Sequence, residues 1–190
     1  MDKAAKTLLS GGVALLPTDT VYGLLASPLH PKAVATIFAL KGRNTAKALP
    51  ILVANVAQIT GLGVALDTRT KALLDMQIGA LTMVLPVASP PAWLLGRTEV
   101  ALRMPDDPAL KALLGQTGPL LATSANASGQ DTPAEVPEIL TQLAGTPDIV
   151  VDDGPRTSRP STLIDTQTTP FTVLRRGALA EADITEILAL

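Results

Sequence analysis

Short apolar runs alternate along this chain with segments whose apolar residues recur at helical spacing. VALLP (13–17) and ALTMVLP (80–86) have the length and composition of buried strands. PKAVATIFAL (31–40) has helical periodicity and begins with Pro31, a residue favoured at the first position of a helix. Over the whole sequence the pattern predicts strands at residues 13–17, 49–54, 80–86, 99–104, 119–124, 148–151, 161–165 and 171–175, and helices at 3–9, 31–40, 67–75, 106–114 and 182–189.

Polar residues ahead of several helical segments predict where those helices begin. Asp67 is placed to cap a helix that runs through Asp75, and Asp106 or Asp107 precedes a helix with Pro108 in its first turn. The segment 132–135, TPAE, has the spacing of a capping box. We therefore expect a further helix to start at this segment.

The order of these elements predicts the fold class. Strands that alternate with helices indicate an α/β sheet with helices packed against it. The later strands follow one another with little helix between them, so part of the sheet is expected to be antiparallel. No repeat or linker divides the sequence, and we expect a single domain over residues 1–190.

Composition excludes several functional classes. The chain has no cysteine and one histidine, His30, which argues against thiol nucleophiles, histidine-cluster metal sites and a histidine-based triad. Four aromatic side chains are too few for a base-stacking platform, and a net charge of −2 gives no general attraction for nucleic acid. No apolar run approaches the ~18 residues that span a membrane, and no signal peptide is evident, so we expect a cytoplasmic protein.

Chemistry-bearing residues follow several of the predicted elements. PTDTVYGL (17–24) comes directly after a buried strand, LKGRNTAK (40–47) follows a helix, and ATSANASG (122–129) follows another strand. Arg103 lies on an alternating strand, and RTSRPSTLID (156–165) precedes VLRRGA (173–178). Each segment alone is explained by helix caps, turn formers or solvated arginines.

Together these segments predict a binding site. Strand ends of one sheet can converge on a single crevice, which here would gather cations, hydroxyls and an amide. Neither GxGxxG nor GxxxxGK[ST] is present, so a bound nucleotide is not held by either of these loops. Such a site has no obvious general base and suits a reaction that depends on positioning and charge neutralisation.

Five motifs in this order resemble the YrdC/Sua5/TsaC family, short single-domain type. They are PTDTVYGL, the K-x-R of Lys41 to Arg43 with the following Lys47, TSANASG, PST at 160–162 and LRRGA, and they span about residues 10–178. The resemblance implies a twisted open mixed α/β sheet with flanking helices around a positively lined cavity.

The resemblance further implies L-threonylcarbamoyladenylate synthase, a nucleotidyltransferase that condenses L-threonine, bicarbonate and ATP with Mg²⁺. Partner proteins would then transfer the threonylcarbamoyl group to adenosine 37 of tRNAs that read ANN codons (t6A modification). No nucleophile and no metal-ligating side chain is implied. By position, the residues implied for ATP are Lys41, Arg43, Lys47, Ser124, Asn126 and Arg175. Of these, Lys41, Arg43 and Lys47 would stabilise the charge that develops in the reaction. The residues implied for threonine are Thr20, Arg103, Ser124 and Ser161.

Two positions depart from the family pattern. A Trp-Pro-Gly-Pro segment usually precedes the strand that holds Thr82, where this chain reads MQIGA (76–80), and Leu52 stands where many members have histidine. Three alternatives stay open. Two follow from the resemblance itself: a non-catalytic binder of double-stranded RNA or tRNA, and a relative that handles carbamoyl adenylate. The third, an inactive paralogue that binds ATP, follows from the missing Trp-Pro-Gly-Pro segment.

Overall fold

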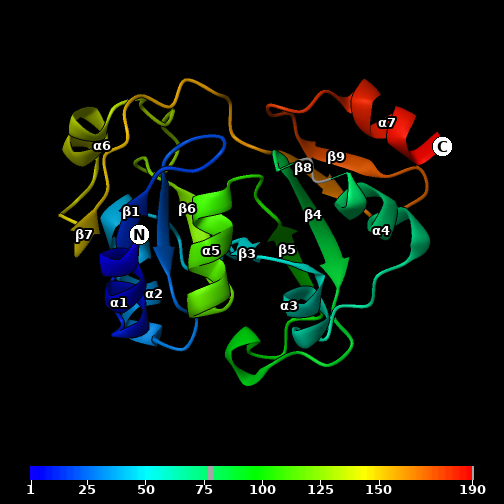
Figure 1. The fold of residues 1–190 in the computed structure, drawn as a ribbon, viewed down its shortest axis with the longest axis horizontal. Helices are drawn as coiled ribbons and strands as arrows, with labels where there is room; N and C mark the ends of the chain where they lie inside the picture. The colour runs from blue at the N-terminus through cyan, green and yellow to red at the C-terminus, as the bar shows by residue number, and fades with distance from the viewer. Residues whose placement is uncertain (77–78, 190) are drawn as a thin grey trace.

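Nine strands form one mixed sheet in the computed structural model, which describes residues 1–76 and 79–189 (Figure 1). The strand order is β7-β1-β2-β6-β3-β5-β4-β8-β9. The sheet is mixed: for example, β3 runs parallel to β5, whereas β4 runs antiparallel to β5. The predicted mixed α/β sheet is confirmed. The strands are β1 (Ala14–Leu16), β2 (Gly23–Ala26), β3 (Ile51–Leu52), β4 (Leu81–Pro86), β5 (Glu99–Arg103), β6 (Leu120–Ser124), β7 (Ile149–Val150), β8 (Thr162–Asp165) and β9 (Thr172–Arg175).

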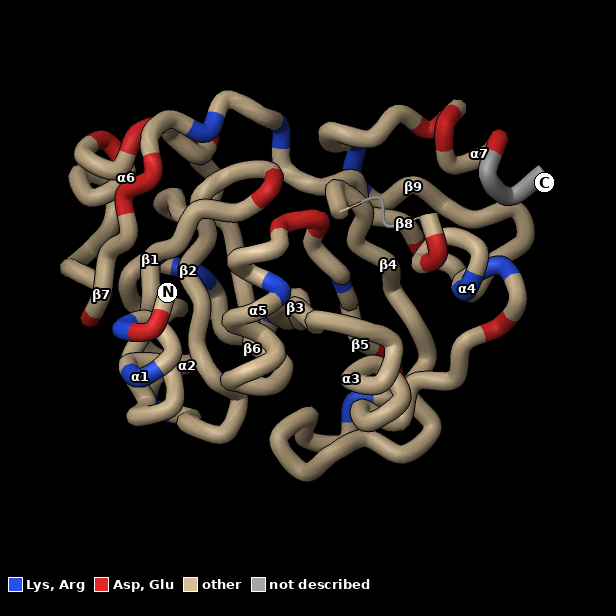
Figure 2. Tube along the Cα trace, in the orientation of Figure 1, with Lys and Arg blue, Asp and Glu red and all other residues tan. Residues whose placement is uncertain are grey.

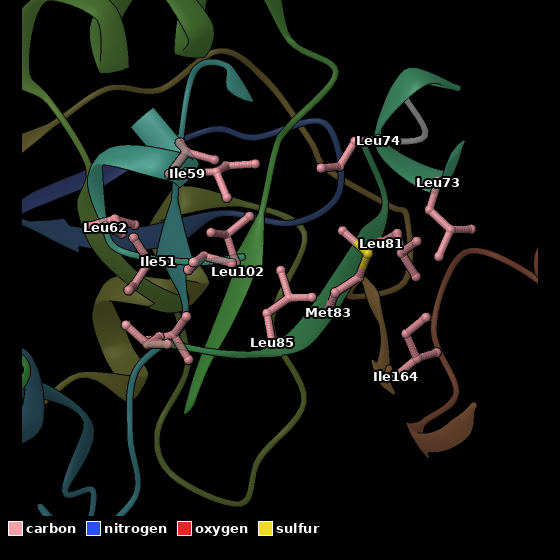
Figure 3. Close-up of a cluster of buried hydrophobic side chains, with 14 of the residues drawn as sticks. Ile51, Ile59, Leu62, Leu73, Leu74, Leu81, Met83, Leu85, Leu102 and Ile164 are labelled. Carbon is pink, nitrogen blue, oxygen red and sulfur yellow. The ribbon is translucent and has the colours of Figure 1, made fainter. Parts of the chain in front are cut away.

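The helices cover the sheet unequally. They are α1 (Asp2–Leu9), α2 (Pro31–Lys41), α3 (Val56–Gly61), α4 (Thr68–Asp75), α5 (Pro108–Thr117), α6 (Val136–Gln142) and α7 (Glu181–Ala189), with one 3₁₀ turn, η1 (Ala92–Leu94). One face packs on α2 and α6 at its β1–β2 end and on α3, α4 and α7 at its β4–β8 end. Figure 3 shows this second cluster, where Ile51, Leu102 and Met83, cross-strand neighbours, point toward the helices.

On the opposite face, α1 and α5 bury only the end formed by β1, β2, β6 and β3. Side chains alternate between the faces of a strand, so Ala101 and Arg103 of β5 point away from the buried Val100 and Leu102. Thr82 of β4 shares this opposite face with its neighbour Leu163. This part of the sheet carries polar side chains on its face, and the site lies there.

The helix predicted to begin at Pro31 does begin there. Of the three starts predicted from polar capping residues, two were right and one was wrong. The carboxylates of Asp67 and Asp107 accept hydrogen bonds from backbone N–H groups in the first turns of α4 and α5. The capping box at 132–135 is wrong, since α6 begins at Val136. The Thr132 hydroxyl instead donates to Asn126 Oδ1 (3.0 Å), six residues earlier in the chain, a partner that the capping-box spacing does not reveal.

Some short elements were not predicted from the sequence. The sequence pattern did not predict β2, which continues the PTDTVYGL segment, or α3, which is only six residues long. Gln77 and Ile78, in the segment that replaces Trp-Pro-Gly-Pro, lie outside the described residues. No helix in the described ranges has the length and apolar character needed to cross a membrane.

Candidate active site

A cavity of about 220 Å³ opens on the partly uncovered face of the sheet. Three cross-strand pairs from different parts of the sheet line it: Gly23 with Ser124, Leu52 with Arg103, and Leu163 with Arg175. Residues from the separated segments that were predicted to converge on one crevice do line one cavity, and this cavity lies on a face of the sheet. The polar lining includes the guanidinium groups of Arg43, Arg103 and Arg175 and the hydroxyls of Thr18, Thr20, Thr82, Thr123, Ser124 and Ser161.

The loop after β1 is stabilised by hydrogen bonds made by one of its own hydroxyl side chains. Thr18 Oγ1 donates to Val21 O (2.7 Å) and accepts from the backbone N–H of Thr20 (3.1 Å). A short hydroxyl side chain that bonds to backbone two or three residues away stabilises a tight turn. The turn holds Thr20, which is 1% exposed, in the cavity wall.

Arg103 is fixed by two short hydrogen bonds at the floor of the cavity. Its Nε donates to Gly79 O (2.6 Å), and its Nη2 donates to Asp19 Oδ1 (2.6 Å). Burial lowers the pKa of the guanidinium, and the Asp19 carboxylate acts in the opposite direction. A Cβ at Gly79 would overlap Asp19 and the backbone of Asp106, so this close approach requires glycine.

A hydroxyl pair and a second arginine form the opposite wall. Ser161 Oγ lies 2.7 Å from Thr82 Oγ1, and Arg175 Nη2 donates to Ser161 O (2.7 Å) and to Ser161 Oγ (3.2 Å). Burial lowers the pKa of the Arg175 guanidinium, and repulsion from Arg103 and Arg43 adds to this effect. Arg103 and Arg43 are therefore close enough to make it more costly for Arg175 to carry its charge.

Arg43 completes the group with an incompletely satisfied side chain. Its Nη2 donates to Ala48 O (3.0 Å), whereas its buried Nε has no acceptor in the described part of the chain. Burial lowers its pKa as well. The cavity-lining residues described include three guanidinium groups and no carboxylate. Asp19, outside the lining, pairs with Arg103 alone, so no ion pair among the described residues balances the charges of Arg43 and Arg175. An anionic ligand would relieve this imbalance.

Three residues predicted for ATP lie outside the cavity lining. Lys41 and Asn126 are buried behind the wall, where Lys41 Nζ donates to Asn126 O (2.6 Å). Lys47 is exposed on the segment that leads to Ala48, which does line the cavity. Leu52, at the position where many family members have histidine, contributes an apolar surface to the wall.

Sequence reasoning missed two residues that organise the site. Asp19 was one unassigned residue of PTDT, and its role depends on Arg103 and Gly79, which are distant in sequence. Tyr22 is fully buried, and its hydroxyl donates to Gly154 O (2.8 Å) and accepts from Asp153 N (3.0 Å). The single tyrosine thus anchors the connection from β7 to β8, which leads into Ser161.

The described residues do not form a metal-binding site from their own side chains. No group of three or more His, Cys, Asp or Glu side chains among them is arranged to hold a metal ion. Hydroxyls and guanidinium groups make up the polar lining, which is a donor set suited to phosphate and carboxylate oxygens.

The structure is that of an α/β protein with an open mixed sheet and, on its partly uncovered face, a cavity whose guanidinium and hydroxyl groups suit anionic small molecules. The chain belongs to the Sua5/YciO/YrdC family, whose model, described as "Telomere recombination", matches residues 6–177. This confirms the family predicted from the motifs.

Named relatives cover most of the chain. It is 36% identical over 158 residues to the threonylcarbamoyl-AMP synthase of Bacillus subtilis, which covers 80% of this chain and 46% of that protein. It is 35% identical over 173 residues to the threonylcarbamoyl-AMP synthase of Alkalilimnicola ehrlichii, covering 87% and 90%. The solved structure of P. abyssi Sua5 complexed with L-threonine matches with a TM-score of 0.86 at 31% identity, covering 97% of this chain and 56% of that one. The chain thus spans about half the length of two of these relatives.

Proposed function

We propose that this chain condenses L-threonine, bicarbonate and ATP to threonylcarbamoyl-AMP, pyrophosphate and water, as a nucleotidyltransferase. The observation that carries the proposal is the convergence of Arg43, Arg103 and Arg175 on one hydroxyl-lined cavity. All three substrates are anionic or carry a carboxylate, and guanidinium groups recognise carboxylate and phosphate oxygens in pairs. The names of the relatives and the L-threonine complex of P. abyssi Sua5 support the same reaction.

The threonine end of the cavity is assigned to Arg103, Thr20 and Ser161. Gly79 and Asp19 hold Nε and Nη2 of Arg103, which leaves Nη1 for the threonine carboxylate. Thr20 and Ser161 present hydroxyls from opposite walls, where they would meet the polar atoms of the amino acid. Asp19 keeps the charge of Arg103 balanced until the carboxylate arrives.

The nucleotide end is assigned to Arg43 and Arg175, with Ser124 between the two substrates. The unsatisfied Nε of Arg43 is a donor for a phosphate oxygen. Lys47, on the same exposed segment, remains a predicted phosphate contact. With Arg103 at the threonine end, this division would put guanidinium groups on both sides of the reacting α-phosphorus.

The reaction itself requires no protein nucleophile. Threonine and bicarbonate give a carbamate with loss of water, a carbamate oxygen attacks the α-phosphorus, and the bond to pyrophosphate breaks. Negative charge accumulates on the phosphates, and preorganised guanidinium groups stabilise it without reorganisation. The lining residues described include no carboxylate, so Mg²⁺ would enter with ATP, held by phosphate oxygens, and would supply further neutralisation.

The wider role is t6A modification of tRNA in the cytoplasm, with partner proteins transferring the threonylcarbamoyl group. A non-catalytic RNA-binding role has less support, because Figure 2 shows basic positions scattered over α1, α4 and the loop near β8, with acidic positions between them. A continuous basic surface is what RNA binding requires.

The test is an omission assay. Purified protein is incubated with ATP, Mg²⁺, bicarbonate and L-threonine, and threonylcarbamoyl-AMP and pyrophosphate are measured as each substrate is left out in turn. We expect product only when all are present. Product with carbamoyl phosphate in place of threonine and bicarbonate would assign the chain to carbamoyl-adenylate chemistry. ATP binding without product would indicate an inactive paralogue.

A further inference from the structure

Lys41 has an unusual environment for a lysine. The residue is 3% exposed, and its Nζ donates to Ser124 O, to Asn126 O (2.6 Å) and to Asn126 Oδ1 (3.3 Å). A lysine ammonium has three N–H donors, so these three acceptors use all of them. The ion pairs found among the described residues do not include Lys41. Carbonyl and amide oxygens therefore hold this charge.

The end of α2 directs Lys41 and Arg43 to different places. Gly42 has φ 58° and ψ 36°, a left-handed conformation that glycine adopts without strain. Its N–H bonds to Ala39 O, and the N–H of Arg43 bonds to Phe38 O, which ends the helix. As a result Arg43 lines the cavity, whereas Lys41 lies beneath the loop after β6.

That loop is tied to Lys41 at several points. The backbone N–H of Ser128 donates to Lys41 O (2.8 Å), in addition to the side-chain bonds. The Asn126 amide donates to Gln130 O (2.7 Å) and its Oδ1 accepts from Thr132 (3.0 Å). Of Lys41, Ser124 and Asn126, only Ser124 lines the cavity.

We propose that Lys41 is a positioning residue, which fixes the backbone at Ser124 and Asn126 so that Ser124 faces the substrates, and which does not touch a phosphate itself. The proposal deepens the proposed function and rests on it for the identity of the substrates. It replaces a direct contact between Lys41 and ATP with an effect transmitted through the loop.

The charge of Lys41 adds a pH dependence. Burial and, to a lesser degree, the nearby Arg43 lower the pKa of the ammonium to about 8. The groups that face it are the carbonyls of Ser124 and Asn126, the Asn126 amide and the Arg43 guanidinium. An anion in the cavity favours the protonated form, so affinity for ATP is expected to fall as pH rises through about 8.

The experiment compares Lys41→Met, Ser124→Ala and the double variant, with Lys32→Met as the control on an exposed lysine at the other end of α2. Lys41→Met is expected to lower kcat/KM for ATP by about 10- to 150-fold. This is the contribution of one hydrogen bond to a charged group, here the contact with the substrates that Ser124 would lose. Ser124→Ala is then expected to change the Lys41→Met variant by less than about 2-fold, because the two residues act as a unit. Hydrogen exchange at 124–130 should rise, and the fall in ATP affinity near pH 8 should disappear.

Two results would overturn the proposal. The first is that the two substitutions, Lys41→Met and Ser124→Ala, lower kcat/KM for ATP independently, so that their fold-changes multiply in the double variant, while hydrogen exchange at 124–130 is unchanged. The second needs no variant and applies if Lys41→Met does not fold: in a crystal structure of the wild-type protein with ATP, Lys41 Nζ would lie within hydrogen-bond distance of a phosphate oxygen. Wild-type protein that binds ATP but forms no product would refute the proposed function alone, since the crystal structure and the exchange data still report on Lys41.

Discussion

Replacing Arg103 by lysine removes the fork geometry and keeps the charge. The arginine uses Nε and Nη2 for Gly79 O and Asp19, each at 2.6 Å, and has a third nitrogen for substrate. A lysine ammonium is a single point at the end of a flexible stem and does not reach three acceptors that a planar group serves at once. Arg103→Lys is expected to lose the bond to the threonine carboxylate.

The magnitude follows from the kind of bond lost. A hydrogen bond to a charged group contributes about 1.5–3 kcal/mol, which corresponds to about 10- to 150-fold. We expect KM for threonine to rise within this range while KM for ATP changes by less than about 3-fold, the cation being retained. Initial rates of pyrophosphate release, with one substrate varied and the others saturating, measure both constants.

The matched control for this substitution is Arg97→Lys, at an exposed arginine just before β5. It should leave both KM values unchanged. If Arg103→Lys folds normally and raises only KM for ATP, the assignment of Arg103 to the threonine carboxylate is refuted and the two ends of the cavity are exchanged.

Three further substitutions test other parts of the account. Arg43→Ala should lower kcat/KM for ATP by about 10- to 150-fold through loss of a phosphate contact, and an unchanged value would remove Arg43 from the nucleotide end. Tyr22→Phe should lower Tm by a few degrees and speed limited proteolysis at 152–160, because the bonds to Gly154 and Asp153 are lost; unchanged cleavage there would contradict the anchoring role. Asp67→Ala should cost about 1 kcal/mol of stability at neutral pH through loss of the α4 cap. Hydrogen bonds with Thr70 lower the folded-state pKa of Asp67, so the wild-type advantage is present above about pH 4 and should disappear as pH falls further; an advantage that persists in acid would contradict the cap.

Local patterns predicted the elements whose stability is local. The carboxylate caps of α4 and α5 were found because Asp67 and Asp107 bond to N–H groups three residues away. The helix start at 132–135 was wrong because Thr132 has a partner, Asn126, in a different segment. β2 went unrecognised because its four residues adjoin a polar motif and are defined by pairing with β1 and β6.

The site residues likewise include some that a local pattern predicted and others that depend on contacts between distant segments. Period-2 alternation placed Arg103 on a strand with one polar face, which the structure confirms. The ion pair of Arg103 with Asp19 was not predictable, because it requires Gly79 to bring distant segments together. Nor does the spacing of K-x-R show that Gly42 turns Arg43 into the cavity and leaves Lys41 behind its wall; that depends on a left-handed backbone.

The most direct test of the central claim uses ¹³C-bicarbonate. Wild-type protein, Arg103→Ala and Arg97→Ala are incubated with labelled bicarbonate, ATP, Mg²⁺ and L-threonine, and threonylcarbamoyl-AMP is measured by mass spectrometry. We expect product heavier by the mass of the label for the wild-type protein and Arg97→Ala, and a large loss of product for Arg103→Ala. Labelled product at the wild-type rate from a folded Arg103→Ala protein, or none from the wild-type protein, would contradict a condensation carried out in this cationic cavity.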